Sequence, residues 1–366
     1  MRKDTLKRLI TTVVVISVVG IFGGLVYCGL SKNNTKSRST NVTTQKVGTS
    51  QKETITKSET PNDVAQKKED DENTALIQKM EKGYWAANKA LGYINPIYLG
   101  YNPGLILSGE NIIKSAQSYA VPANQVVKMI NGTYKGTQKE VFLTFDDGPS
   151  PNNTPKILKI LKDNGVHATF FVVGKFLKSY PELQKVVREE LMDGNAIGDH
   201  TFNHEYSEIY PGNEVDVSEY MKQDNETATL LQDLLGPDFD TRILRMPGGY
   251  MSRRYYNDPH LTALNEAFDK EHVTALDWNG ETGDAESSGQ LDVNKLVSEM
   301  KEQIKGKNQV VILMHDAGAK VDTVKALPAV INYFKDNGYE FKVIENAPIS
   351  SFDNIPVVTH TNSNQE

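Results

Sequence analysis

Two adjacent carboxylates, Asp146 and Asp147, stand at the end of an apolar run. The run, Val141–Phe145, has the length and residue types of a buried strand, and Gly148-Pro149 after the acids is typical of a turn. A carboxylate pair at a strand end can bind a cation or exchange protons with a substrate, although Asp-Gly-Pro is also ordinary turn chemistry. Phosphatases with such a pair usually place the acids two positions apart, so adjacency argues against that reaction.

Two histidines, His200 and His204, follow the strand candidate Ala196–Gly198. Their four-residue spacing would put both imidazoles on one face of a helical turn, where they can bind the same ion. The chain has seven histidines and a single cysteine, Cys28, which excludes a zinc site built on several thiolates. We therefore expect a metal site made of imidazoles and carboxylates.

Three further strand ends carry titratable side chains. They are Arg245 in Arg245-Met246-Pro247-Gly248-Gly249, Asp277 in Leu276-Asp277-Trp278, and His315 in Leu313-Met314-His315-Asp316. Each is a weak signal alone, typical of a solvated loop. Together with the first two motifs they lie where parallel α/β proteins gather their active residues, at the carboxyl ends of strands.

The elements that position these residues alternate along the chain from Glu140 onward. The predicted strands are Val141–Phe145, Ala168–Val173, Ala196–Gly198, Arg242–Arg245, Val273–Leu276, Val310–Met314 and Phe341–Ile344. The predicted helices between them include Thr154–Lys162, Glu182–Met192, Glu214–Leu235, Val293–Ile304 and Val321–Phe334. This alternation predicts an α/β fold with a parallel sheet, either open and doubly wound or closed into a barrel.

The N-terminal part differs in composition from the rest. Residues Leu9–Leu30 carry no charge and are long enough to span a bilayer, which takes about 20 residues, so we expect an uncleaved, single-pass membrane anchor. Basic residues before it favour a cytoplasmic N-terminus and an extracytoplasmic catalytic part. The expected division is an anchor at 1–30, a low-complexity tether at 31–73, a helical extension of unknown role at 74–137, a catalytic domain at 138–346 and a tail at 347–366.

The 366-residue chain has a formal net charge of −7, which gives no general attraction to nucleic acid. Within the extension, apolar periodicity predicts helices at Asn73–Gly92 and Asn124–Ile130. No motif in the chain indicates a protein partner.

In their order, the five motifs resemble the polysaccharide deacetylase family, also called carbohydrate esterase family 4 or the NodB homology domain. The resemblance covers residues 138–346 and rests most on Thr144–Pro149 and His200–His204. It implies a distorted, incomplete (β/α) barrel and a metal-dependent reaction that removes acetyl groups from a glycan.

The resemblance also implies roles for individual residues. Asp147, His200 and His204 would hold one divalent ion, commonly zinc. Asp146 would be the general base, oriented by Arg245, and His315 the general acid, oriented by Asp277. Trp278 and Leu313 would line the groove near the acetyl group, and the Gly248 N–H would face the developing oxyanion. Met246, Gly248 and Thr274 depart from the family pattern, which affects the expected substrate preference more than the chemistry.

An outward-facing domain on a membrane tether indicates a substrate in the cell wall, and we expect N-acetylglucosamine units of peptidoglycan. Chitin-like chains, poly-N-acetylglucosamine and acetylated xylan remain open alternatives, since each presents an acetyl group. A non-catalytic glycan-binding wall protein is a further alternative. A phosphomonoesterase is less consistent, because no anion-binding Gly-rich helix start accompanies the acids.

Overall fold

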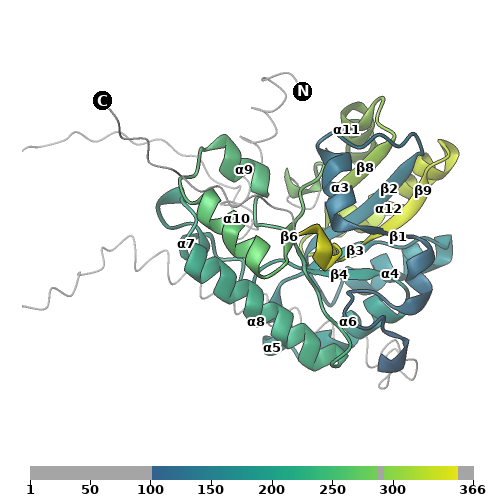
Figure 1. Cartoon of the computed structure of the whole chain (residues 1–366). Helices are drawn as coiled ribbons and strands as arrows, with labels where there is room; N and C mark the ends of the chain where they lie inside the picture. Colours follow the sequence, from purple (N-terminus) through teal and green to yellow (C-terminus); the bar gives the residue numbers. More distant parts are fainter. Residues whose placement is uncertain (1–100, 287–291, 353–366) are drawn as a thin grey trace, which may run out of the picture.

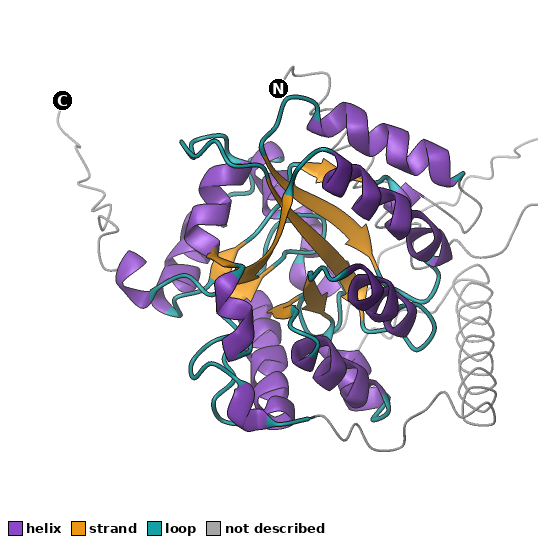
Figure 2. Ribbon diagram, turned by 90° about the vertical axis from the view of Figure 1, so that its right-hand side faces the viewer, coloured by secondary structure: helices purple, strands orange, loops and turns teal. Residues whose placement is uncertain are grey.

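A parallel β-sheet forms the centre of the protein, and helices surround it (Figures 1 and 2). The structure, a computed structural model, describes residues 101–286 and 292–352. Its strands are β1 (Ala120–Pro122), β2 (Glu140–Gly148), β3 (Thr169–Val172), β4 (Ala196–Asp199), β5 (Ile243–Leu244), β6 (Thr274–Ala275), β7 (Gly280–Glu281), β8 (Gln309–His315) and β9 (Glu340–Glu345). Its α-helices are α3 (Ala123–Ile130), α4 (Thr154–Asn164), α5 (Gly174–Ser179), α6 (Leu183–Met192), α7 (Tyr206–Ile209), α8 (Val217–Leu235), α9 (Tyr250–Tyr255), α10 (Leu261–Lys270), α11 (Val293–Ile304) and α12 (Val321–Asp336).

Strand β2 organises the sheet. On one side it pairs with β8 from Glu140 to Asp146, and on the other it pairs first with β9 and then with β3. The sheet continues from β3 through β4 and β5 to β6, while β8 pairs with β7 and β9 with β1. All these pairings are parallel, so the carboxyl ends of the strands meet at one end of the sheet.

Two of the edge strands, β6 and β7, are joined directly by residues 276–279. At one end of this segment the Leu276 N–H donates to the Leu244 carbonyl beside β6, and at the other the Asn279 N–H donates to Val311 of β8. One short segment therefore bridges both edges, which requires the sheet to curl round.

Strand side chains alternate between two cores. Phe142, Phe171, Ile243 and Val311 come from four different strands and pack together inside the curled sheet. Their neighbours along the strands, such as Val141, belong to the larger outer core, which also holds helix residues. The inward positions are the ones that lead to the functional site.

All seven predicted strands are present with small shifts in their ends, which confirms the α/β alternation. Strands β1 and β7 were not predicted, because they are short and contain Pro122 and Gly280, both disfavoured in strands. Helix α8 begins at Val217 rather than at Glu214, since the Asp216 carboxylate caps the helix by accepting the Glu219 N–H at 3.0 Å.

Part of the expected extension belongs to the same folded unit. Strand β1 pairs with β9, and α3 matches the helix predicted at Asn124–Ile130. The helix predicted at Asn73–Gly92 and the membrane span predicted at Leu9–Leu30 lie outside the described residues. Across residues 101–286 and 292–352, no helix is both long and apolar enough to cross a bilayer.

Asn111 joins this N-terminal segment to the sheet. Its fully buried side chain donates to the carbonyls of Ile197 and Ile344 at 3.1 and 3.0 Å and accepts the Asn346 N–H at 3.0 Å. It therefore links β4 to β9, which are not neighbours in the sheet.

We predict that Asn111→Ala lowers the free energy of unfolding by about 2 to 4 kcal/mol, because it leaves buried backbone groups unpaired. Chemical denaturation measures this change. The control Asn294→Ala, at an exposed position of α11, should change it by less than about 0.5 kcal/mol. Equal, small effects would show that Asn111 does not join the two parts.

Candidate active site

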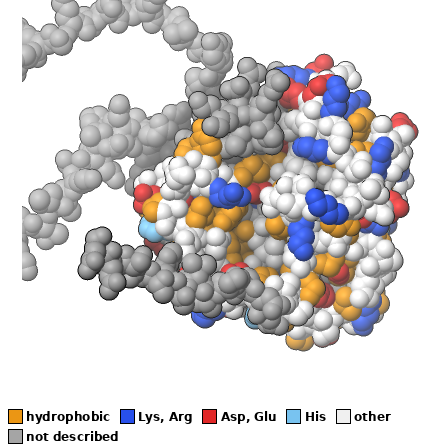
Figure 3. Space-filling model, turned by 45° about the horizontal axis from the view of Figure 1, so that its top comes forward, with side chains coloured by type: hydrophobic (Ala, Val, Ile, Leu, Met, Phe, Trp, Pro, Cys, Tyr) orange, Lys and Arg blue, Asp and Glu red, His pale blue; other side chains and the backbone are white. Residues whose placement is uncertain are grey.

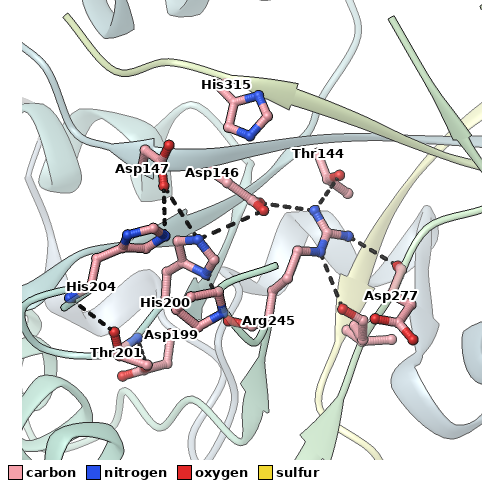
Figure 4. Close-up of polar contacts among 12 residues, drawn as sticks. Thr144, Asp146, Asp147, Asp199, His200, Thr201, His204, Arg245, Asp277 and His315 are labelled. Atoms are coloured by element: carbon pink, nitrogen blue, oxygen red, sulfur yellow. Dashed lines mark hydrogen bonds and ion pairs between the residues drawn. The ribbon is translucent and has the colours of Figure 1, made fainter. Parts of the chain in front are cut away.

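Inward-facing positions at the carboxyl ends of the strands bring four titratable residues together. Asp146 continues the inward series of β2, and His315 is its paired partner on β8. His200 follows β4 directly and Arg245 follows β5. Figure 4 shows His315 on one side of the aspartates and the other histidines on the opposite side.

A β-bulge places Asp147 in the same site. Strand alternation alone would turn Asp147 away from Asp146, but the register between β2 and β3 shifts between Asp146 and Gly148. Asp147 is the extra residue and has a left-handed backbone, with φ of 69°. The bulge therefore gives two adjacent acids to one site.

Asp147, His200 and His204 form a group that can hold a metal ion. The Asp147 Oδ1 atom lies 3.3 Å from the Nε2 atom of each histidine, and the potential ligand atoms all lie within 4.8 Å of one another (Figure 4). Within the described ranges this is the only such group of three. A carboxylate and two imidazoles are ligands that suit a divalent transition metal.

His200 and His204 lie in a loop that brings both rings to Asp147, so the expectation of a helical turn is wrong. Thr201 and His204 both have left-handed backbones, with φ of 63° and 60°. The Asp199 carboxylate accepts the Thr201 N–H at 2.5 Å, and the Thr201 hydroxyl accepts the His204 N–H at 3.2 Å. These side-chain bonds hold a conformation that few residues adopt unaided.

The histidine rings are prepared to bind a cation. The Nδ1 atom of His200 donates to the Arg245 carbonyl at 2.6 Å, which directs the Nε2 atom toward Asp147, 3.3 Å away. Burial lowers the pKa of the His200 ring, but Asp146 and Asp147 outweigh burial and raise it, so a cation bound here would displace the Nε2 proton. Burial lowers the pKa of His204 to about 4 against the opposing charge of Asp147, so its ring is neutral at pH 7. Burial alone would raise the pKa of Asp147, but the neighbouring histidines lower it far below its usual value. The residues present therefore fit a divalent ion.

Arg245 holds Asp146 from the side opposite the metal group. Its fully buried Nη1 donates to the Asp146 Oδ1 atom at 2.9 Å and to the Thr144 hydroxyl at 2.7 Å. Its Nε and Nη2 donate to the backbone carbonyls of Leu276 and Asp277. The guanidinium thus ties β2 to the segment that joins the sheet edges.

His315 is oriented by Asp284, so the expectation that Asp277 does this is wrong. Its Nδ1 atom lies 2.9 Å from Asp284 Oδ1, and its backbone N–H donates to Asp284 Oδ2 at 2.8 Å. The Thr323 hydroxyl donates to the same Oδ2 at 2.6 Å. Asp284 follows the unpredicted strand β7; a strand assigned there would have marked it as another strand-end acid.

Electrostatics keeps His315 protonated near neutral pH. Burial lowers the pKa of the ring, but Asp284, Asp147 and Asp146 outweigh burial and raise it to about 9. The pKa of Asp284 is lowered, because the charged ring and its hydrogen bonds outweigh burial. The pair therefore presents a proton to the site.

Asp277 instead supports the turn that contains Gly248. Its Oδ2 atom accepts the Met251 N–H at 3.0 Å, in the first turn of α9, and burial raises its pKa to about 6 despite Arg245. Gly248 has φ of 75°, and a Cβ atom there would lie 2.7 Å from the Tyr206 hydroxyl. Tyr206 occupies the space that a side chain at position 248 would need, which explains a glycine there.

Trp278 and Leu313 are buried in the inner core, each 4% exposed. The Trp278 ring packs 5.7 Å from the Arg245 guanidinium and against Gly249. The structure thus places both residues beneath the site, with little surface to offer a substrate.

Comparisons with known proteins agree with this fold and site. The family model described as polysaccharide deacetylase matches residues 133–267. The structure of a Streptococcus mutans CE4 esterase is 35% identical with a TM-score of 0.60, covering 66% of this chain and 99% of that one. A peptidoglycan-N-acetylglucosamine deacetylase of Bacillus cereus is 30% identical, over 57% of this chain and 87% of its own. A chitooligosaccharide deacetylase of Azorhizobium caulinodans is 29% identical, over 55% and 91%.

The chain therefore belongs to the polysaccharide deacetylase family, carbohydrate esterase family 4, which confirms the resemblance seen in the motifs. It is a hydrolase that acts on carbohydrate amide or ester bonds.

We predict that Asp284→Asn moves the alkaline limb of the pH–rate profile to lower pH by about one to three units. A general acid must be protonated, so activity falls as pH rises through the pKa of His315, and Asp284 is the carboxylate that raises this pKa. Asp277→Asn is the matched control: it should leave the alkaline limb in place, whatever it does to the rate. A limb that moves with Asp277→Asn and not with Asp284→Asn would reverse this assignment.

Proposed function

We propose that the chain is a metal-dependent N-deacetylase that removes acetyl groups from N-acetylglucosamine units of peptidoglycan. The observation that carries the chemistry is the pairing of Asp146 with His315 across β2 and β8, beside a group of three metal-ligating side chains. We also propose Zn²⁺ as the ion, since it favours imidazole and carboxylate ligands. The curled sheet would then be the distorted barrel of the family.

The chain supplies a base at one side of the reacting carbonyl. A divalent ion held by Asp147, His200 and His204 would polarise the acetyl oxygen and lower the pKa of a water molecule toward about 7. Asp146 has one carboxylate oxygen on Arg245 and directs the other, Oδ2, to within 3.9 Å of His200 Nε2. Asp146 Oδ2 is therefore placed to take the proton of the attacking water.

His315 supplies the acid on the other side. An amide nitrogen cannot leave as an anion because the anion is too basic, so it must receive a proton as the bond breaks. His315 carries that proton and is held by Asp284. The Gly248 N–H would donate to the oxygen on which negative charge develops, a contribution of about 2.7 to 4 kcal/mol in other enzymes. The products are acetate and a free amino sugar.

The substrate proposal rests on the expected location and on the relatives. An anchor at residues 9–30 and a tether at 31–73 would hold the catalytic domain in the layer outside the membrane. The Bacillus cereus relative is named for peptidoglycan, whereas the Azorhizobium relative is named for chitooligosaccharides. Chitin-like chains are therefore the main alternative, followed by poly-N-acetylglucosamine and acetylated xylan.

The face of the protein drawn in Figure 3 is consistent with a neutral partner. On the face shown in Figure 3, Lys and Arg are interspersed with acidic and uncharged side chains and do not form one continuous positive area. This supports a glycan substrate over nucleic acid.

Acetate release from four substrates tests the proposal. Full-length protein in detergent, with Zn²⁺, is incubated with peptidoglycan sacculi, chitin oligomers, poly-N-acetylglucosamine and acetylated xylan. We expect acetate from sacculi at the highest kcat/KM. Acetate release from only one of the other glycans would identify that glycan as the substrate in place of peptidoglycan. Release from none of the four would favour a glycan-binding protein without catalytic activity.

We predict that His315→Ala loses about 100-fold or more in kcat on an N-acetyl substrate and much less on an O-acetyl ester. An alkoxide leaves more readily than an amide nitrogen, so the ester depends less on the acid. Asp146→Asn is the comparison, since loss of the base should affect amide and ester alike. Equal losses on both substrates for His315→Ala would contradict its role as the acid.

A further inference from the structure

Asp316, the residue after His315, makes three hydrogen bonds with the segment that runs from Asp146, near the end of β2, to the start of α4. Its N–H donates to the Asp146 carbonyl at 3.1 Å, and its own carbonyl accepts the Ser150 hydroxyl at 2.5 Å. Its carboxylate Oδ2 accepts the hydroxyl of Thr154, the first residue of α4. Asp316 is 1% exposed, and Thr154 is fully buried.

The Thr154 hydroxyl links Ser150 to Asp316. Its oxygen accepts the Ser150 N–H at 2.8 Å, and its proton can be donated to the Asp316 carboxylate. The carboxylate thus closes a ring of contacts through Thr154 and Ser150. These contacts do not pass through the metal ligands or through His315.

The carboxylate also packs directly under the bulge. A Cβ atom on Gly148 would lie 2.1 Å from Asp316 Oδ2, so only glycine fits between Asp147 and Pro149. Asp147, the neighbour of Gly148, has the left-handed backbone that brings its side chain to the histidines. Removing the carboxylate would therefore remove the support of the turn that orients a metal ligand.

A second contact joins the same two loops nearby. The fully buried Asn153 donates through Nδ2 to the carbonyls of Ala317 and Gly318 at 2.7 and 3.2 Å. The loop after β2 and the loop after β8 are thus held together at several points, and Asp316 is the one closest to the bulge.

We propose that Asp316 is a positioning residue, which holds the bulged end of β2 and the loop after it against the end of β8 and thereby fixes the geometry of the metal site. The family resemblance assigns no function to Asp316. It rests on the proposed metal site but not on the identity of the glycan.

Metal binding by the full-length protein tests the proposal without any substrate. We expect Asp316→Ala to weaken Zn²⁺ binding by about 10- to 100-fold in calorimetry and to change the visible absorption of the Co²⁺-substituted protein. Asp316→Asn keeps an oxygen that can accept the Thr154 hydroxyl and should restore most of the affinity. If wild-type protein binds no divalent ion, the proposed metal-dependent function is wrong. If wild-type protein binds the ion and Asp316→Ala binds it equally well, only the proposed role of Asp316 is wrong.

Asp258→Ala is the matched control for a general loss of stability. Asp258 is also buried and accepts the N–H groups of Val215 and His260 at 2.9 and 3.0 Å, but it does not contact the site. It should lower the melting temperature while leaving Zn²⁺ affinity and the Co²⁺ spectrum unchanged. The proposal would be overturned if Asp316→Ala lowered the melting temperature but kept the wild-type Zn²⁺ affinity and Co²⁺ spectrum.

Thr154→Val provides a second variant should Asp316→Ala not fold. It keeps the side-chain shape and removes the hydroxyl, whereas Thr154→Ser keeps the hydroxyl. We expect weaker Zn²⁺ binding in Thr154→Val and near wild-type binding in Thr154→Ser. Unchanged binding in Thr154→Val would contradict the proposal as directly as the alanine result.

Discussion

Side chains of neighbouring residues in a β-strand point to opposite faces, so two adjacent aspartates cannot normally serve one site. The bulge at Asp147 removes this constraint. Asp146 keeps the inward direction of β2 and reaches Arg245, while Asp147 turns to the histidines. The separation of base and ligand, and hence the reaction proposed for the chain, depends on this one local irregularity.

The rest of the fold supplies partners on both sides of the bulge. Strand β8 carries His315, and the segment after β7 carries Asp284, which holds its ring. The segment joining the sheet edges supplies carbonyls that hold Arg245. Curling of the sheet is therefore part of the site, because it brings the β5–β6 edge and residues 276–279 round to β8, so that Arg245 reaches Asp146 of β2. Burial then makes the charge pairs effective by excluding water from them.

Strands and helices of the catalytic part were predictable because apolar periodicity and strand-end positions are local signals. His200 and His204 were found from their type and spacing, whereas the choice of Asp147 over Asp146 as a ligand came from the family resemblance. The helical turn expected for the histidines is absent, since the left-handed Thr201 and His204 depend on side-chain hydrogen bonds. Asp284 was missed because β7 is two residues long and leaves no periodic pattern. The role of Asp277 was carried over from the family resemblance and is wrong here, because which acid contacts His315 depends on how segments distant in the sequence pack together.

The most direct test compares the metal content and turnover of two neighbouring variants, Asp146→Asn and Asp147→Asn. Each is purified at full length, loaded with Zn²⁺, washed and measured for bound ion and for acetate release. The account predicts that Asp147→Asn loses the ion and with it the activity, whereas Asp146→Asn keeps one ion per chain and still loses about 100-fold or more in kcat. Loss of the ion from Asp146→Asn together with its retention by Asp147→Asn would show that the bulge presents the two acids the other way round.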